Sequence, residues 1–237
     1  MKRSPFAHAS FLSRGTFAVA CFALVLVALF DSKFPFAVHA QSLVADYATA
    51  SYESSTAALS SADRTFLELA ASVGQTAPAR RLIDYKLSND PTVKERYWAI
   101  VDFSQPSTSK RLYVFDTVNK TIERYYVAHG RGSGENIAER FSNQSGSNSS
   151  SLGIYRTLNE YGGNHGRSLR LEGLEATNSS AFSRAVVMHT ADYVSDAFIR
   201  RTGRLGRSEG CFAVEKSVGD ALIDKLKDGA YIIASKN

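Results

Sequence analysis

Cysteine is scarce in this chain of 237 residues, which contains only Cys21 and Cys211. The sequence has no cluster of cysteines at the spacing of a metal site, so a cysteine-based zinc module is not expected. It also shows neither heptads nor internal repeats, which argues against a coiled coil and against a repeat architecture.

Excess charge is also small once the N-terminus is set aside. The whole chain carries a formal net charge of +5. Residues 1–40 hold four basic residues and one acidic residue, so the remainder has a net charge of +2. Such a balance does not form the basic footprint of a nucleic-acid-binding protein, and we expect no nucleic-acid partner.

The one long hydrophobic run lies near the N-terminus. Lys2, Arg3 and Arg14 precede the unbroken apolar run Phe17–Phe30, and small residues surround Ala40. This order of charge, apolar run and small residues predicts an export signal over residues 1–40, cleaved after Ala40. The run is shorter than the roughly 18 residues of a typical membrane span. The polar stretch before Ala40 is long for a signal, so an uncleaved anchor is the alternative, and it would be the only membrane contact expected.

Cleavage would remove Cys21 and leave Cys211 as the only cysteine of an exported protein. A single cysteine in an oxidising compartment is either an intermolecular link or a free reactive thiol. Cys211 therefore becomes the first candidate for a chemical role.

Residues 41–94 are predicted to be an Ala/Ser-rich spacer with short helices. A helix over Thr65–Ala70 should end near Gly74, with Pro78 beyond it, and Arg80–Leu87 suggests a second helix. Residues 95–237 are predicted to form the main domain. A chain of about 197 residues after cleavage fits one such domain plus an appendage.

Short alternating apolar segments dominate residues 95–237 and predict strands separated by turns. One clear helix is predicted over Ser217–Lys227, with Ser217 as its cap, Asp220 as a capping-box acid and Gly229 closing it. Many strands and few helices indicate a mostly β domain. The expected strands are Tyr97–Asp102, Arg111–Asp116, Thr121–Val127, Ile154–Thr157, Ser168–Leu171, Ala185–His189 and Ala230–Ala234.

Three polar loops are expected between these strands, over residues 129–134, 141–153 and 161–166. Their Gly and Ser content fits ordinary turn chemistry. Long loops in a compact domain are often binding loops, which makes them candidates for lining a site.

The apolar run Ala185–Met188 leads directly to His189, and the turn Gly206–Gly210 leads to Cys211. A thiol and an imidazole at the ends of neighbouring elements can meet, and the imidazole can then take the thiol proton. Such pairing would lower the thiol pKa, with Glu209 opposing the effect and Arg207 offsetting it. The alternative is a buried structural cysteine and an unrelated histidine.

Four segments together resemble the L,D-transpeptidase catalytic domain of the YkuD-like superfamily: Phe141–Asn143, Ser150–Gly153, the strand ending at His189, and Gly206–Cys211. The last segment is the most specific. The resemblance covers roughly residues 95–235. It implies a β-sandwich-like fold and an enzyme of the periplasm or cell envelope that acts on peptidoglycan stem peptides.

The chain departs from the common pattern of that superfamily at three places. Glu209 stands where the usual signature has histidine, and Ala213 stands where many members carry arginine. The separation of His189 and Cys211 is also longer than usual. We interpret these differences as features of an Arg-Ser-x-Gly-Cys branch that affect substrate preference more than chemistry.

The expected site has Cys211 as nucleophile and His189 as base, with the N–H groups of Gly210 and Cys211 as an oxyanion hole. No acidic partner for His189 is evident, so a backbone carbonyl is expected to fix its tautomer. Arg207, Ser208 and Tyr193 are the candidates for substrate contact, and no metal or cofactor is expected.

His129 and His165 are weaker candidates for lining the cleft. The predicted function is L,D-transpeptidation through a thioester. The alternatives are L,D-carboxypeptidation, with water as acceptor, and a non-catalytic cell-wall-binding module.

Overall fold

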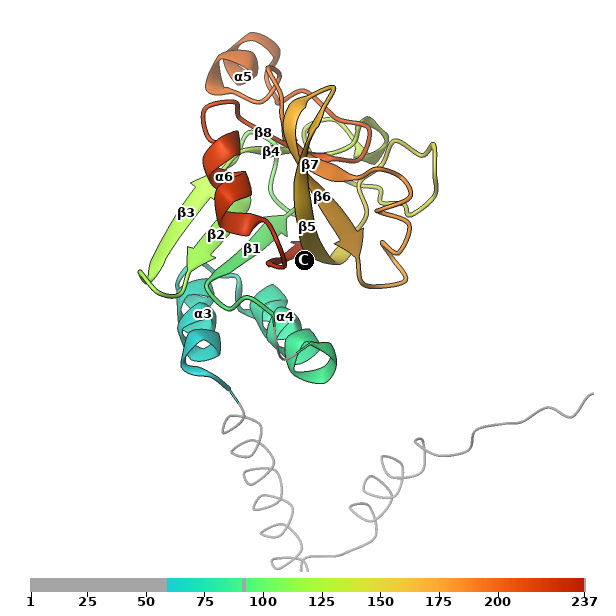
Figure 1. Cartoon of the computed structure of the whole chain (residues 1–237). Helices are drawn as coiled ribbons and strands as arrows, with labels where there is room; N and C mark the ends of the chain where they lie inside the picture. The colour runs from blue at the N-terminus through green and yellow to red at the C-terminus, as the bar shows by residue number, and fades with distance from the viewer. Residues whose placement is uncertain (1–58, 91–92, 237) are drawn as a thin grey trace, which may run out of the picture. The chain divides into compact units, whose positions relative to one another are not determined.

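The computed structural model describes residues 59–90 and 93–236 (Figure 1). The predicted export signal, and the spacer up to residue 58, lie outside the described residues. Within the described part, no helix has the length and apolar character needed to cross a membrane. The helices are α3 (Ser61–Ser72), α4 (Thr76–Asn89), α5 (Asp196–Thr202) and α6 (Gly219–Leu226), with a short 3-10 turn, η1 (Arg131–Ser133).

The fold is mostly β, as the sequence predicts, and its strands form a single curved sheet. The strand order is β3-β2-β1-β9-β5-β6-β7-β8-β4. The strands are β1 (Tyr97–Asp102), β2 (Leu112–Asp116), β3 (Thr121–Tyr125), β4 (Val127–Ala128), β5 (Gly153–Gly163), β6 (Gly166–Gly173), β7 (Val187–Thr190), β8 (Phe212–Val214) and β9 (Tyr231–Ser235).

The two outermost strands of this sheet are joined by a single residue. β3 ends at Tyr125 and β4 begins at Val127, yet they occupy opposite edges of the strand order. The sheet must therefore curl until its edges approach each other, which gives a barrel-like shape with an enclosed face and an outer face.

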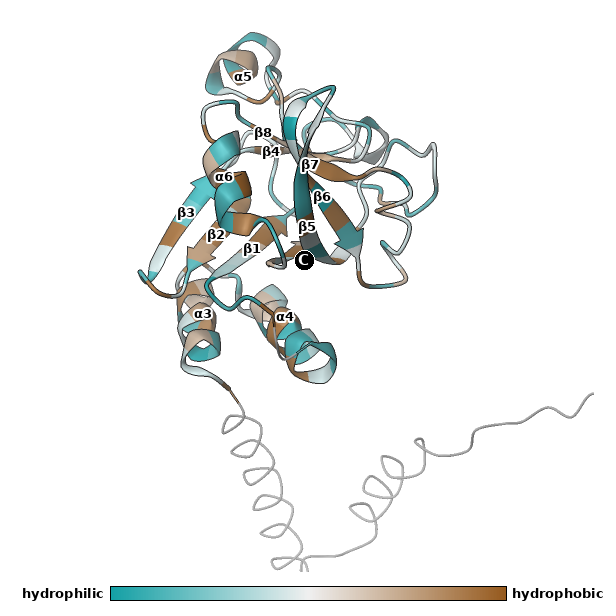
Figure 2. Cartoon of the chain, in the orientation of Figure 1, coloured by the Kyte–Doolittle hydropathy of each residue, from teal (hydrophilic) through white to brown (hydrophobic). Residues whose placement is uncertain are grey.

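Alternating side chains of the central strands fill these two faces, as the period of two in a β-strand requires. In β1, Ala99 and Val101 enter the enclosed core, together with Leu222 of α6. Trp98 enters a second core under α3 and α4, where its ring stacks on Phe66 with centroids 4.8 Å apart. Figure 2 shows hydrophobic residues along β1 and β2, whereas β3 is largely hydrophilic.

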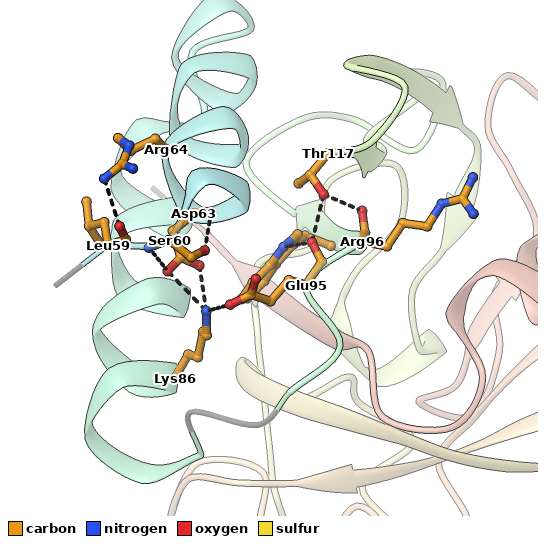
Figure 3. A network of polar contacts seen from close by, with 9 residues as sticks. Leu59, Ser60, Asp63, Arg64, Lys86, Glu95, Arg96 and Thr117 are labelled. Atoms are coloured by element: carbon orange, nitrogen blue, oxygen red, sulfur yellow. Dashed lines mark hydrogen bonds and ion pairs between the residues drawn. The ribbon is translucent and has the colours of Figure 1, made fainter.

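A buried ionic cluster links α3, α4 and the segment before β1 (Figure 3). Lys86 donates to Asp63 Oδ1 at 2.8 Å and also contacts Glu95. Burial alone would lower the pKa of Lys86, but the hydrogen bonds to Asp63 and Glu95 outweigh it and raise the pKa. The two helices are thus tied to the sheet by charge as well as by apolar packing.

Several boundaries differ from the sequence predictions. α4 begins at Thr76 and includes Pro78 in its first turn, where a missing N–H costs nothing. The predicted loop 161–166 is instead the end of a long hairpin, because β5 extends to Gly163 and β6 starts at Gly166. That hairpin turn uses the left-handed conformation of Gly166, whose φ is +77°.

The helix ends also required correction. α6 begins at Gly219 with Val218 at the N-cap and without a side-chain cap, so neither Ser217 nor Asp220 has the predicted capping role. A capping box does occur at the start of α3, between Ser60 and Asp63. α5 was not predicted, because its seven residues bury no side chain and carry no apolar period.

Candidate active site

Cys211 lies at the end of a tight turn, directly before β8. The hydroxyl of Ser208 closes this turn: it accepts from the Gly210 N–H at 3.1 Å and donates to the Cys211 carbonyl at 2.7 Å. Gly210 has φ +120°, and a side chain there would approach the Ser149 carbonyl oxygen to 2.8 Å. Glycine is therefore required at this position for both conformation and space.

His189 lies on β7, which runs parallel to β8 and pairs with it. In this register His189 is opposite Ala213, two residues beyond Cys211. The His189 side chain is buried, and its Nδ1 is 2.9 Å from the Thr190 carbonyl oxygen. A carbonyl only accepts, so Nδ1 carries the proton and Nε2 is left as an acceptor. The expected backbone orienter is thus the Thr190 carbonyl.

One cavity of about 690 Å³ contains both side chains. Of the predicted site residues, the cavity lining includes Cys211, His189, Arg207, Ser208 and Tyr193. The loop predicted over residues 141–153 contributes Ser145, Gly146 and Asn148 to the lining. The turn and the parallel strand pair therefore bring two segments more than 20 residues apart in the sequence to the same cavity.

The electrostatics of the resting site differ from the prediction of a lowered thiol pKa. Burial raises the pKa of Cys211, and the charge of Glu209 adds to this, while the Val187 N–H and Arg184 only partly oppose it. Burial also lowers the pKa of His189. The resting site therefore holds a neutral thiol beside a neutral imidazole, and the thiol Sγ lies 3.7 Å from the Ala185 carbonyl oxygen.

The predicted substrate-contact residues have structural partners of their own. Arg207 donates to the Gly134 carbonyl at 3.1 Å and pairs with Glu135 at 2.5 Å. Ser208 is occupied in the Cys211 turn. Burial, with the nearby Cys211 and Glu209, raises the pKa of Tyr193 to about 12, so its hydroxyl stays protonated at neutral pH.

Of the two weaker histidine candidates, one lies outside the cavity lining and the other lies within it. His129 is fully buried outside the cavity lining, where Nη2 of Arg111 lies 2.7 Å from its Nδ1. Burial and the Arg111 charge lower the pKa of His129 to about 4, so it stays neutral and serves the core. His165 does line the cavity, and its ring stacks on that of His189.

Arg184 also lines the cavity, although no pattern in the sequence predicted it. Its guanidinium donates to the Ser142 carbonyl at 2.8 Å and to the Ser149 carbonyl at 2.6 Å. It thereby holds the 142–149 loop against the Cys211 turn. A lone arginine in a polar segment has no local pattern that distinguishes it from a solvated surface residue.

Comparisons with known proteins show which family and which solved structures this chain is similar to. The family described as "L,D-transpeptidase catalytic domain" matches residues 70–234. No curated protein matches the chain. Among solved structures, an L,D-transpeptidase from Mycobacterium smegmatis aligns at 12% identity with a TM-score of 0.37, over 59% of this chain and 58% of that one.

A second solved structure, an L,D-transpeptidase in complex with imipenem, aligns at 10% identity with a TM-score of 0.37. The alignment covers 59% of each chain. This chain therefore spans less than two thirds of either solved structure.

Proposed function

Because the chain belongs to the L,D-transpeptidase catalytic domain family, we propose that it is a cysteine acyltransferase acting on peptidoglycan stem peptides. The observation that carries the proposal is the single cavity shared by Cys211 and His189, with the Nε2 atom of His189 left as an acceptor. A nucleophile, a base and a fixed tautomer are the components that acyl transfer requires.

In the first step, the Sγ atom of Cys211 attacks a carbonyl carbon of the donor stem peptide. The thiol proton passes to Nε2 of His189 as the S–C bond forms. The C–N bond then breaks, and His189 gives the proton to the departing amine. The products are a thioester on Cys211 and one released residue.

The oxygen of the attacked carbonyl becomes negative during this step. The N–H groups of Gly210 and Cys211 are proposed to stabilise it, because backbone donors fixed in place need no reorganisation. The Gly210 N–H already donates to Ser208 Oγ at 3.1 Å, so it would share its hydrogen between the two oxygens.

In the second step, an acceptor amine attacks the thioester carbonyl and gives its proton to His189. The C–S bond breaks, Cys211 leaves as a thiol after reprotonation, and a new amide cross-link results. Water in place of the amine would give L,D-carboxypeptidase activity by the same steps. Arg207 and Tyr193, which line the cavity, are proposed to contact the peptide.

The neutral resting pair has a mechanistic consequence. Since burial raises the pKa of Cys211 and lowers that of His189, we propose that the thiol proton moves to His189 as the substrate is attacked and not in the resting enzyme. The carbonyl of Thr190 then stabilises the imidazolium that forms, because it already accepts from Nδ1.

We also propose that residues 1–40 are an export signal, that residues 41–94 lead into a catalytic domain over 95–237, and that the protein works in the periplasm or cell envelope. A basic segment followed by an apolar run and small residues supports the signal. N-terminal sequencing of protein from the cell envelope tests it. A mature chain starting at or near Gln41 is expected, and retention of Met1 would contradict cleavage.

The function is tested by incubating the protein with stem peptides and analysing the products by mass spectrometry. Dimeric peptides are expected from wild type and from neither Cys211→Ser nor His189→Ala. Trimmed monomers without dimers would instead establish the carboxypeptidase. No turnover by wild type, with retention of the protein on peptidoglycan, would favour the cell-wall-binding module.

A further inference from the structure

A second imidazole lies against the proposed base. The rings of His165 and His189 are stacked, with centroids 4.2 Å apart and planes inclined by 21°. His165 is exposed, whereas His189 is buried. The exposed ring therefore covers one face of a buried ring that the proposed mechanism requires.

The place of His165 is set by the β5–β6 hairpin, whose turn it occupies. Ser168 of β6 pairs directly with His189 of β7, so the turn lies just beyond the base. Arg167 then fixes the hairpin to α6, because it donates to Glu160 Oε2 at 2.6 Å and to Asp224 Oδ1 at 2.6 Å. Arg167 thus links the two strands of the hairpin to each other and the hairpin to α6.

We propose that His165 is a positioning residue for His189, which holds the plane of the base by stacking on it from the hairpin turn. The inference rests on the proposed function, since it assigns His165 a part in the same reaction. It gives His165 no contact with the reacting atoms and no proton to transfer.

The geometry of the pair favours stacking over proton relay. Hydrogen bonds of imidazole lie in the plane of the ring, along its N–H and lone-pair directions. Two nearly parallel rings face to face cannot direct a nitrogen of one toward a nitrogen of the other. His165 therefore acts through its ring face, which restricts the rotation of His189.

The hydrogen bond from Nδ1 of His189 to the Thr190 carbonyl restrains the base at one edge of its ring, and the His165 ring adds a contact on the ring face. The stack restricts rotation of the His189 ring. Burial lowers the pKa of His189, and the neighbouring His165 acts on it in the same direction. The lowered pKa keeps Nε2 of His189 available as an acceptor.

The test compares His165→Ala and His165→Phe with Asn159→Ala, a control that removes an exposed polar side chain from the same hairpin. Turnover of stem peptides is measured at saturating and limiting substrate. We expect His165→Ala to lower kcat about tenfold with KM within about twofold, because misplaced groups lose rate more than ground-state binding. His165→Phe retains the stack and should keep kcat within about threefold of wild type.

A second measurement does not depend on the substrate. The Nδ1 proton of His189 is followed by proton NMR, and its signal should broaden in His165→Ala and persist in His165→Phe and Asn159→Ala. Equal signals in all variants, or a His165→Phe variant as slow as His165→Ala, would overturn the positioning role. Absence of turnover in wild type would contradict the proposed function alone, and the NMR signal would still decide the inference.

Discussion

The thiol of Cys211 lies between two opposite charges, and neither is its proposed base. Arg184 lowers the pKa of Cys211, while Glu209 raises it together with burial, which is the larger effect. Glu209 occupies the position where the superfamily signature that this sequence resembles has histidine, so this chain carries a charge there that opposes the thiolate. In the proposed mechanism the thiol proton is therefore transferred during attack.

Glu209→Gln should speed alkylation of Cys211 by iodoacetamide at neutral pH. Removing the carboxylate lowers the thiol pKa and raises the thiolate fraction. Glu209 is exposed and pairs with Arg131 at 3.1 Å, so the expected gain is small, about twofold. Glu172→Gln, which removes a carboxylate paired with Arg156 on β5 and β6, is the matched control. A rate equal to that control would show that Glu209 has no influence.

The pH dependence of the same alkylation distinguishes a neutral thiol beside a neutral imidazole from a preformed thiolate–imidazolium pair. Because the pKa of Cys211 is raised, the wild-type rate should climb with a single titration at a higher pH than for an exposed cysteine, whose pKa is about 8.5. His189→Ala should leave this profile nearly unchanged. A plateau near neutral pH that disappears in His189→Ala would instead reveal a preformed thiolate–imidazolium pair.

Cys211 and His189 could be proposed as candidates from the sequence because each ends a recognisable local pattern, a glycine-rich turn and an apolar strand, and both line the same cavity. The raised thiol pKa could not be predicted, since it results mainly from burial, and Arg184, which lowers the pKa, approaches from another segment. His165 emerged only as a weak candidate for the same reason. The stacking of His165 on His189 results from the pairing of the hairpin with β7, which residues adjacent to His165 in the sequence do not reveal.

At the scale of elements, the turn before β8 fixes the position of Cys211, the proposed nucleophile. Gly210→Ala should abolish turnover and lower stability by about 1–3 kcal/mol, because alanine disfavours φ +120° and its side chain would meet the Ser149 carbonyl oxygen. Activity assays and thermal unfolding measure the two effects.

Gly162→Ala is the control for this change, because a side chain at Gly162 on β5 meets no atom within 4 Å. It should retain activity and change stability little. If Gly210→Ala behaves like Gly162→Ala, the turn is more adaptable than the structure indicates.

The buried ionic cluster that links α3, α4 and the segment before β1 should contribute strongly to stability. Lys86→Met leaves Asp63 buried without its ammonium partner, so unfolding free energy should fall by about 3 kcal/mol. Arg81→Ala removes an exposed ion pair from the same helix and should cost at most about 1 kcal/mol. Denaturant unfolding measures the loss of unfolding free energy in each variant. Equal losses would contradict the expectation that the buried ion pair matters more than the exposed one.

At the scale of the whole molecule, the mostly β character was predictable because apolar and polar residues alternate in many short segments of the sequence. Residues Tyr97–Asp102 were predicted as a strand and form β1 with those bounds. The strand order was not predictable, since β1 pairs in parallel with β9 from the other end of the domain. The packing of α3 and α4 on Trp98 likewise depends on contacts that no local pattern contains.

The curled sheet also explains how the site is assembled. β7 and β8 are not joined by a short hairpin, yet their parallel pairing places His189 beside the residues that follow Cys211. The 690 Å³ cavity then receives side chains from the β5–β6 hairpin and from the 142–149 loop. We propose that this assembled site forms a covalent acyl-enzyme.

Intact-protein mass spectrometry after brief incubation with a stem peptide tests whether this acyl-enzyme forms. We expect a mass increase equal to the peptide minus its released residue, located on Cys211 by peptide mapping. The adduct should be absent from Cys211→Ser and should form far more slowly in His189→Ala. Stem-peptide turnover by wild type without any adduct, or turnover that persists in Cys211→Ser, would contradict this proposal.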